Sequence, residues 1–275
     1  TGFMLRKAAP RTSELLEPLA MLSAGGIFGS AQAVAAQFSA PEFRRMIETL
    51  WKLNDFYTEH RMRAAELNAE IEQLGYPSFS GGMAGVPFDA YSDFLRGTLL
   101  SLSDLYMNTE YIERYIDEEI EKTLAMIRAT KGQNEGKHVF MALHKGMDGF
   151  MSDEHYRKYY WKHLQQIILA IIDSGKVPYI YTEGKYNSRL DCLSEVPPGK
   201  VFYHFEDVDM AVAKKKLGGI ACIAGGFPAS LVDWWTPETV RDAVKRLLDD
   251  CAPGGGFIFE TSCGLGKCKR ENVEA

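Results

Sequence analysis

The sequence predicts an α/β fold, a (β/α)8 TIM-type barrel of which strands three to eight are visible. From Tyr76 onward, short apolar runs alternate with helix-like stretches, which indicates βα units and a parallel sheet. Polar residues collect where these runs end, as they do at the active-site face of barrel enzymes. No G-x-G-x-x-G follows an early strand, although a dinucleotide-binding open sheet would carry one. The barrel is therefore favoured over a doubly wound sheet.

The chain is expected to form one domain over residues 1–275, with a helical N-terminal part (1–75) and barrel units (76–275). Pro41 suits the first turn of a long helix in the N-terminal part. Strands are expected at 76–84, 138–144, 177–183, 200–206, 220–224 and 256–262. Helices are expected at 12–75, 88–130, 152–174, 207–217 and 236–251. The first two barrel strands would lie before Thr1 or within residues 1–40.

Two of these helices have clear start signals in the sequence. Ser152 is followed by Asp153 and Glu154, and Thr236 is followed by a proline and then a glutamate. A hydroxyl side chain at the N-cap accepts a hydrogen bond from a backbone N–H group of the first turn, and acidic residues there suit the helix dipole. Asp207 is expected to cap the helix at 207–217. Asp209 is expected to contact the His204 ring and orient it as a metal ligand.

Composition excludes several classes of protein. The chain has 275 residues and a formal net charge of −6, which argues against a nucleic-acid partner. No apolar run reaches the roughly 18 residues that span a bilayer, and no signal-peptide core is visible. The five cysteines form no C-x-x-C pair and are odd in number, which is typical of free thiols in a reducing compartment. We therefore expect a cytoplasmic protein; its oligomeric state does not follow from the sequence.

His204, Glu206 and Cys263 are candidate metal ligands. Side chains two residues apart in a strand point to the same face, so His204 and Glu206 would project together at the end of one strand. Cys263 ends the last strand-like run. One imidazole, one carboxylate and one thiolate with an open fourth position are typical of catalytic zinc. The alternative is a buried histidine, a surface glutamate and a free cysteine without a metal.

Two further residues are candidates for catalysis. Glu183 ends a strand, and a carboxylate in a barrel mouth is costly unless it is paired or bound to metal, so Glu183 is a catalytic candidate or a fourth zinc ligand. His144 ends another strand, where it could act in catalysis or cap the following loop. With strands numbered three to eight, His144, His204 and Cys263 fall on strands four, six and eight. Alternate strands share a layer of the barrel interior, so these side chains could converge.

The chain resembles the uroporphyrinogen decarboxylase superfamily, and more closely its corrinoid-dependent methyltransferase branch. The resemblance spans 76–275 and rests on the order and spacing of several segments. They are Gly81-Gly82 through Pro87-Phe88 and Arg96-Gly97 to Asp104, His144–Ser152, Tyr159–Leu164, Gly225–Pro228, Thr236–Val240, Pro253–Ile258 and Glu271-Asn272. The superfamily implies a (β/α)8 barrel. In the methyltransferase branch, a His-x-Cys at one strand end and a later Cys-Gly bind zinc. His204 and Cys263 match this pattern, whereas Glu206 stands where the middle cysteine would be.

The resemblance implies a methyltransferase that moves a methyl group between a small methylated compound, or a thiol, and a corrinoid carried by a partner protein. Zinc would act as the Lewis acid, and a methoxylated aromatic is one candidate donor, which would make the reaction an O-demethylation. One alternative is a decarboxylase-type lyase without metal. Another is a non-catalytic, truncated barrel. Substrate identity and the direction of transfer do not follow from the sequence.

Overall fold

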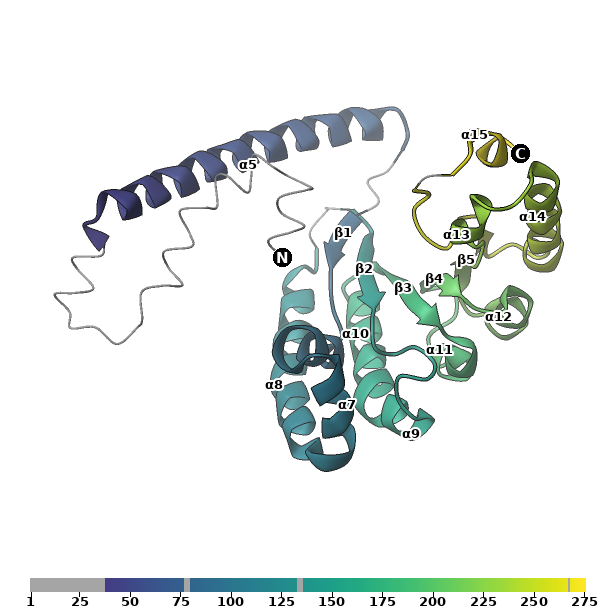
Figure 1. Ribbon diagram of the computed structural model, residues 1–275, viewed down its shortest axis with the longest axis horizontal. Coiled ribbons are helices and arrows are strands. Elements are labelled where there is room, and N and C mark those ends of the chain that lie inside the picture. The colour runs from purple at the N-terminus through teal and green to yellow at the C-terminus, as the bar shows by residue number, and fades with distance from the viewer. Residues whose placement is uncertain (1–37, 77–79, 133–135, 267) are drawn as a thin grey trace. The chain divides into compact units, whose positions relative to one another are not determined.

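A computed structural model of the protein describes residues 38–76, 80–132, 136–266 and 268–275. The chain divides into two compact units, Thr1–Pro77 and Ser78–Ala275. The first unit contains the long helix α5, Pro41–Gln73, with a proline in its first turn as expected (Figure 1). The earlier part of the expected helix, and the place considered for two further strands, fall largely in residues 1–37, outside the described residues. Among the helices that the structure describes, none is long and apolar enough to cross a membrane.

The second unit is built on a six-stranded sheet in which every neighbouring pair of strands is parallel and the spatial order β1-β2-β3-β4-β5-β6 follows the sequence. The strands are β1 Ser80–Met83, β2 His138–Leu143, β3 Val177–Lys185, β4 Phe202–Asp207, β5 Cys222–Gly225 and β6 Phe257–Ile258. A sequential parallel order is that of a barrel wall and not of a doubly wound sheet, whose order reverses at a switch point. The α/β barrel-type fold is thereby confirmed.

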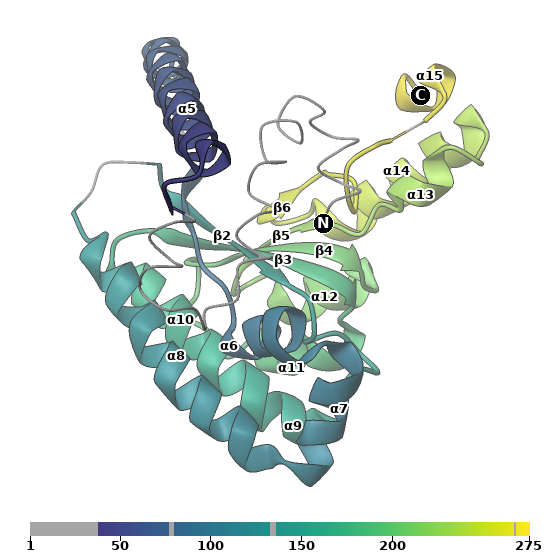
Figure 2. The ribbon, with the colours of Figure 1, turned by 60° about the vertical axis from the view of Figure 1, so that its left-hand side comes forward.

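Helices connect the strands, and those between β1 and β3 lie on one face of the sheet (Figure 2). After β1 come α6 Pro87–Ala90, the π-helical turn η2 Tyr91–Arg96, α7 Thr98–Met107 and α8 Thr109–Ala129. After β2 come α9 Asp153–His155, the π-helical turn η3 Tyr156–Trp161 and α10 Lys162–Asp173. The later connections are η4 Asn187–Arg189, α11 Leu190–Leu193, α12 Met210–Leu217, α13 Ala229–Val232 and α14 Pro237–Cys251, and α15 Arg270–Val273 follows β6.

Strand alternation places the core between the sheet and the helices. On β2, Val139, Met141 and Leu143 are buried, and the residues between them are partly exposed. The opposite face carries a row of rings: Phe140 packs edge-on against Tyr179 at 5.3 Å, and Tyr179 stacks on Phe202 at 4.6 Å. The strand register aligns the next row, which is Ala142, Tyr181, His204, Ala224 and Ile258. This face is therefore aromatic and faces away from the helical layer.

The expected strands are found with shifts at their ends, whereas the single helix expected at 88–130 is divided into α6, η2, α7 and α8. β4 runs on to Asp207, so His204 lies within the strand and not at its end. The expectation that Asp207 caps the next helix is wrong: Asp209 is the N-cap of α12, and its side chain accepts a hydrogen bond from the N–H of Val212 at 3.0 Å. The carboxylate of Asp209 is thus engaged in capping α12. The last strand is short because the chain leaves the ladder after Ile258, and a single bridge joins Phe227 to Thr261 beyond it.

Candidate functional site

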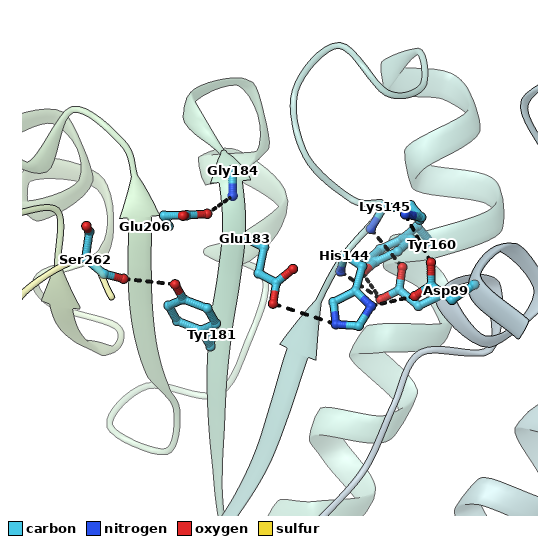
Figure 3. A network of polar contacts seen from close by, with 10 residues as sticks. Asp89, His144, Lys145, Tyr160, Tyr181, Glu183, Gly184, Glu206 and Ser262 are labelled. Atoms are coloured by element: carbon cyan, nitrogen blue, oxygen red, sulfur yellow. Dashed lines mark hydrogen bonds and ion pairs between the residues drawn. The ribbon is translucent and has the colours of Figure 1, made fainter. Parts of the chain in front are cut away.

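The carboxyl ends of β2 and β3 carry a network of charged groups that begins at Asp89 (Figure 3). Asp89 lies in α6, is 5% exposed, and accepts hydrogen bonds from the backbone N–H of His144 at 3.1 Å and of Lys145 at 2.8 Å. The hydroxyl of Tyr160 donates a third at 2.6 Å. The two bonds from the backbone fix His144 and Lys145, the first residues after β2. Each satisfies a backbone N–H group that no neighbouring strand pairs with. Asp89 therefore sets the position of the His144 side chain.

The His144 ring lies between two further carboxylates. Its Nδ1 is 2.5 Å from Oδ2 of Asp93, and its Nε2 faces Oε1 of Glu183 at 3.8 Å. The ammonium of Lys145 pairs with the other oxygen of Asp93 at 3.0 Å. A carboxylate on Nδ1 holds the ring in one orientation and leaves Nε2 as the nitrogen that can exchange a proton. The ring is 38% exposed, so a small molecule at the carboxyl ends of the strands can reach it.

Two π-helical turns present these groups. Asp93 belongs to η2, and Tyr160 belongs to η3. Such turns are rare and frequently mark functional sites, because the extra residue re-aims the side chains of the turn. Here one turn directs a carboxylate toward His144, and the other directs a phenol toward Asp89.

The environment shifts the proton affinities of this network. Burial raises the pKa of Asp89 to about 6, although the hydrogen bonds from Tyr160 and the two backbone groups oppose this. Burial lowers the pKa of His144, but the hydrogen bond to Asp93 and the charges of Asp89 and Glu183 outweigh it, and the net pKa is raised. For Asp93, burial is likewise overcome by the hydrogen bonds from His144 and Lys145, so its pKa is lowered. The imidazolium form of His144 is thus favoured, facing an ionised Asp93.

Arg189, a cation that is only 1% exposed, stabilises the loop after β2. Arg189 donates to the carbonyl oxygens of Gly146 at 3.2 Å and Met151 at 2.7 Å, and it also pairs with Asp153. Its guanidinium lies 4.3 Å from the ring centre of Tyr156. At Gly146 a Cβ would lie 2.7 Å from the Tyr160 ring, so this position accepts only glycine without rearrangement. The loop that carries His144 is therefore held by Asp89 at its start and by Arg189 further along.

A second polar group lies at the ends of β3, β4 and β6. Glu206 accepts a hydrogen bond from the N–H of Gly184 at 2.5 Å, and the Tyr181 hydroxyl donates to the carbonyl oxygen of Ser262 at 2.9 Å (Figure 3). Gly184 has a φ of +79°, within a register shift of the β3–β4 ladder, where a side chain would be strained. Burial, followed by the negative charge of Glu206, raises the pKa of Tyr181. The Tyr181 phenol therefore stays protonated.

His204 is 5% exposed, and both of its ring nitrogens are in hydrogen bonds. Nε2 lies 2.9 Å from the carbonyl oxygen of Thr261, which can only accept, so Nε2 carries the proton. Nδ1 then accepts from the Tyr179 hydroxyl at 2.8 Å. A metal ligand needs a free lone pair on one nitrogen, so zinc would have to displace one of these two partners. His204 in this arrangement connects the middle of the sheet to the segment after β6.

The predicted zinc ligands do not form a metal site in this arrangement. Glu206 is bonded to Gly184, His204 has no free nitrogen, and Cys263 is an exposed free thiol. Within the described ranges, no group of three or more His, Cys, Asp or Glu side chains is placed to hold one metal ion. Zinc at these residues stays a prediction.

Of the residues expected at the site, the structure brings His144 and Glu183 together. Sequence reasoning missed Asp89, Asp93 and Tyr160. Asp89 and Asp93 belong to an expected helix, where an acidic residue looks like part of a solvated face. Their spacing of four residues was a signal, because two carboxylates so spaced lie on one side of a helix.

Comparison with known proteins identifies the family of this chain and a solved structure with a similar fold. The family described as Uroporphyrinogen decarboxylase (URO-D) matches residues 40–275. The chain belongs to this family. A uroporphyrinogen decarboxylase from Neisseria meningitidis serogroup C is 20% identical over 164 residues, which cover 58% of this chain and 45% of that protein. A methyltransferase from Methanosarcina mazei has a similar fold, with a TM-score of 0.57, 18% identity, and coverage of 74% of this chain and 58% of that one. The chain thus spans roughly half the length of these two proteins.

Proposed function

We propose that this URO-D family chain acts in methyl transfer from a small methylated compound to a corrinoid carried by a partner protein, with His144 as the general acid. The observation that carries the proposal is the alignment of Asp93, His144 and Glu183, with Nδ1 of His144 2.5 Å from Asp93 and Nε2 facing Glu183 at 3.8 Å. The raised pKa of His144 favours the protonated ring, which is the form that can donate. A proton donor is what cleavage of a methyl ether requires, because an unprotonated alkoxide or phenoxide leaves poorly.

In the proposed reaction the O–CH3 bond of the donor breaks, and the methyl group passes to the corrinoid, which supplies the nucleophile. The proton on Nε2 of His144 moves to the departing oxygen, so a hydroxyl compound is released. Asp93 keeps the ring oriented during the transfer, and Lys145 balances the charge of Asp93. The ring of Tyr181 is half-buried and lies two residues before Glu183 on the same face of β3, which favours a methoxylated aromatic as the donor.

An exposed apolar surface on η2 and α7 favours a protein partner near this site. Its members are large side chains that are each more than half exposed. They are Phe94, Leu95, Leu99, Leu100, Tyr106 and Met107. The same π-helical turn carries Asp93, so this surface adjoins the His144 network. Exposed apolar surface of this kind is typical of protein–protein contact.

We place the reaction in the cytoplasm, where the free cysteines of the described chain would stay reduced.

The proposal predicts that the protein demethylates a methoxylated aromatic when a reduced corrinoid protein is supplied. We expect the free phenol and the methylated corrinoid to form in equal amounts, measured by chromatography and by the corrinoid absorption spectrum. Uroporphyrinogen, incubated with the same preparation, should be recovered unchanged. Release of carbon dioxide from the porphyrinogen, with no methyl transfer to any corrinoid protein tested, would contradict the proposal and favour the lyase.

The predicted zinc is tested separately from the acid chemistry. Purification without chelators, followed by metal analysis of wild type, His204→Ala and Cys263→Ala, measures bound zinc directly. If His204, Glu206 and Cys263 hold zinc, the wild type should contain about one equivalent and both variants should lose most of it, since a three-ligand site has no ligand to spare. Zinc-free wild type that still transfers methyl groups would exclude a catalytic metal at these residues.

A further inference from the structure

Lys145 is a partly buried cation in the network around His144. Its side chain is 18% exposed, and its ammonium lies 3.0 Å from Oδ1 of Asp93. Its backbone N–H donates to Asp89 at 2.8 Å, which fixes the point from which the side chain starts. The ammonium also lies 5.9 Å from the ring centre of Phe150. Lys145 is therefore held more firmly than an ordinary surface lysine, whose flexible side chain keeps its charge in water.

Asp93 divides its two oxygens between Lys145 and the general acid. Oδ1 faces the ammonium at 3.0 Å, and Oδ2 lies 2.5 Å from Nδ1 of His144. A carboxylate that pairs through one oxygen cannot also turn that oxygen toward the ring, so Lys145 restricts Asp93 to one orientation. These three side chains belong to the compact unit Ser78–Ala275, and their contacts lie within it. The orientation of the His144 ring therefore depends on Lys145 through Asp93.

The charged groups around His144 are three carboxylates and one cation. They are Asp89 of α6, Asp93 of η2, Glu183 of β3 and Lys145 of the loop after β2. Tyr160 of η3 donates to Asp89 and stays uncharged, because burial raises its pKa. Among the ion pairs of this network in the described chain, Lys145 thus supplies the one positive charge besides the ring itself.

A general acid must release its proton as well as hold it. Burial lowers the pKa of His144, but the hydrogen bond to Asp93 and the neighbouring carboxylates outweigh it and raise the net pKa. A weaker acid transfers its proton more slowly, so too high a pKa lowers the rate. Lys145 opposes the carboxylates, because it competes with the ring for the charge of Asp93 and repels the imidazolium as a like charge. The cation therefore keeps the proton of His144 transferable.

We propose that Lys145 is a positioning residue for the general acid, which directs Oδ2 of Asp93 to the His144 ring and weakens the hold of that carboxylate on the ring proton. The inference rests on the proposed function for its place in catalysis, but the effect of Lys145 on His144 needs neither a donor nor a corrinoid. In Lys145→Met, the titration of His144 should move to higher pH. The plateau of kcat for methyl transfer should fall about three- to ten-fold because the acid is weaker, and the KM of the donor should not change.

The titration is followed by NMR of the imidazole C–H signals of the full chain, which contains six histidines. His144 is assigned as the signal that His144→Gln removes. Its midpoint should rise in Lys145→Met and stay at the wild-type value in Lys145→Arg, which keeps the cation. Lys122→Met removes the cation of an exposed ion pair with Glu119 on α8 and is the matched control, in which the midpoint should not move. A midpoint that is unchanged or lower in Lys145→Met would overturn the proposal.

A double variant tests whether Lys145 acts through Asp93. Without the carboxylate at Nδ1 there is no charge for the cation to direct, so Lys145→Met should raise the His144 midpoint by less in an Asp93→Asn background than in the wild type. An equal rise in both backgrounds would mean that Lys145 acts on the ring directly, and the positioning role would be wrong.

The same titrations separate this inference from the proposed function. A midpoint that rises in Lys145→Met, in a protein that transfers no methyl group, would support the effect of Lys145 on His144 and contradict the transferase. Methyl transfer by the wild type, together with an unchanged midpoint in Lys145→Met, would contradict the role of Lys145 alone.

Discussion

Replacement of His144 by glutamine is expected to lower the rate of methyl transfer by about 10²- to 10⁴-fold, the contribution of a positioned general acid. Glutamine keeps a polar side chain of similar reach beside Asp93 but cannot donate a proton to a leaving oxygen. The KM of the methyl donor should change little, because the proposal has the donor held by the ring of Tyr181 and not by the ring nitrogen of His144. The measurement is steady-state kinetics with a saturating corrinoid protein. A variant as active as the wild type would remove His144 from the chemistry.

The pH profile of the same reaction identifies the role of Asp93. The pKa of His144 is raised, so the protonated, active form is complete at low pH and is lost as the pH rises through that raised value. Asp93→Asn removes the hydrogen bond to a carboxylate that most strongly raises this pKa. The alkaline limb of kcat should therefore move to lower pH in this variant. Glu113→Gln, which changes an exposed carboxylate that pairs with Lys158, is the control and should leave the limb in place. An unchanged limb in Asp93→Asn would mean that another group sets it.

The fold followed from the sequence because its signals are local. Short β-branched and aromatic runs such as Val177–Lys185 alternate with amphipathic helices, and this alternation alone specifies a parallel sheet. The π-helical turns η2 and η3 did not follow, since a π-turn is a one-residue insertion that leaves the apolar period nearly unchanged. The cap of α12 was misplaced by two residues because Asp207 and Asp209 are both good N-cap residues.

The site was predictable only in part, for a similar reason. His144 and Glu183 end neighbouring strands, so their approach follows from the parallel register alone. Asp89 lies 55 residues before His144, and nothing in the sequence between them specifies that contact. His204 was expected to hold a metal because strand geometry places it beside Glu206 on one face. Zinc there stays a prediction, and the hydrogen bonds of the His204 ring to Tyr179 of β3 and to Thr261 after β6 did not follow from strand geometry.

Asp89→Ala is expected to reduce the free energy of unfolding by about 3–5 kcal/mol. It removes the acceptor of the hydrogen bonds from the N–H of His144, the N–H of Lys145 and the hydroxyl of Tyr160, and an unsatisfied buried donor costs about 1–3 kcal/mol. Tyr160→Phe removes only one of these bonds and should lose about 1 kcal/mol. Urea unfolding of both variants beside the wild type measures the difference. A loss in Asp89→Ala no larger than in Tyr160→Phe would show that Asp89 does not hold the loop after β2.

Asp89→Asn separates the hydrogen bonds from the charge, because the amide keeps one acceptor oxygen. Burial raises the pKa of Asp89 to about 6, above its ordinary value, so the folded state binds the carboxyl proton more tightly than the unfolded chain does. The stability that this proton contributes is complete below the unfolded pKa, near 4, and is lost as the pH rises through about 6. The asparagine side chain does not titrate, so Asp89→Asn should gain stability relative to the wild type between pH 4 and pH 7. Urea midpoints of the two proteins at a series of pH values measure this, and a constant difference between them would contradict a raised pKa for Asp89.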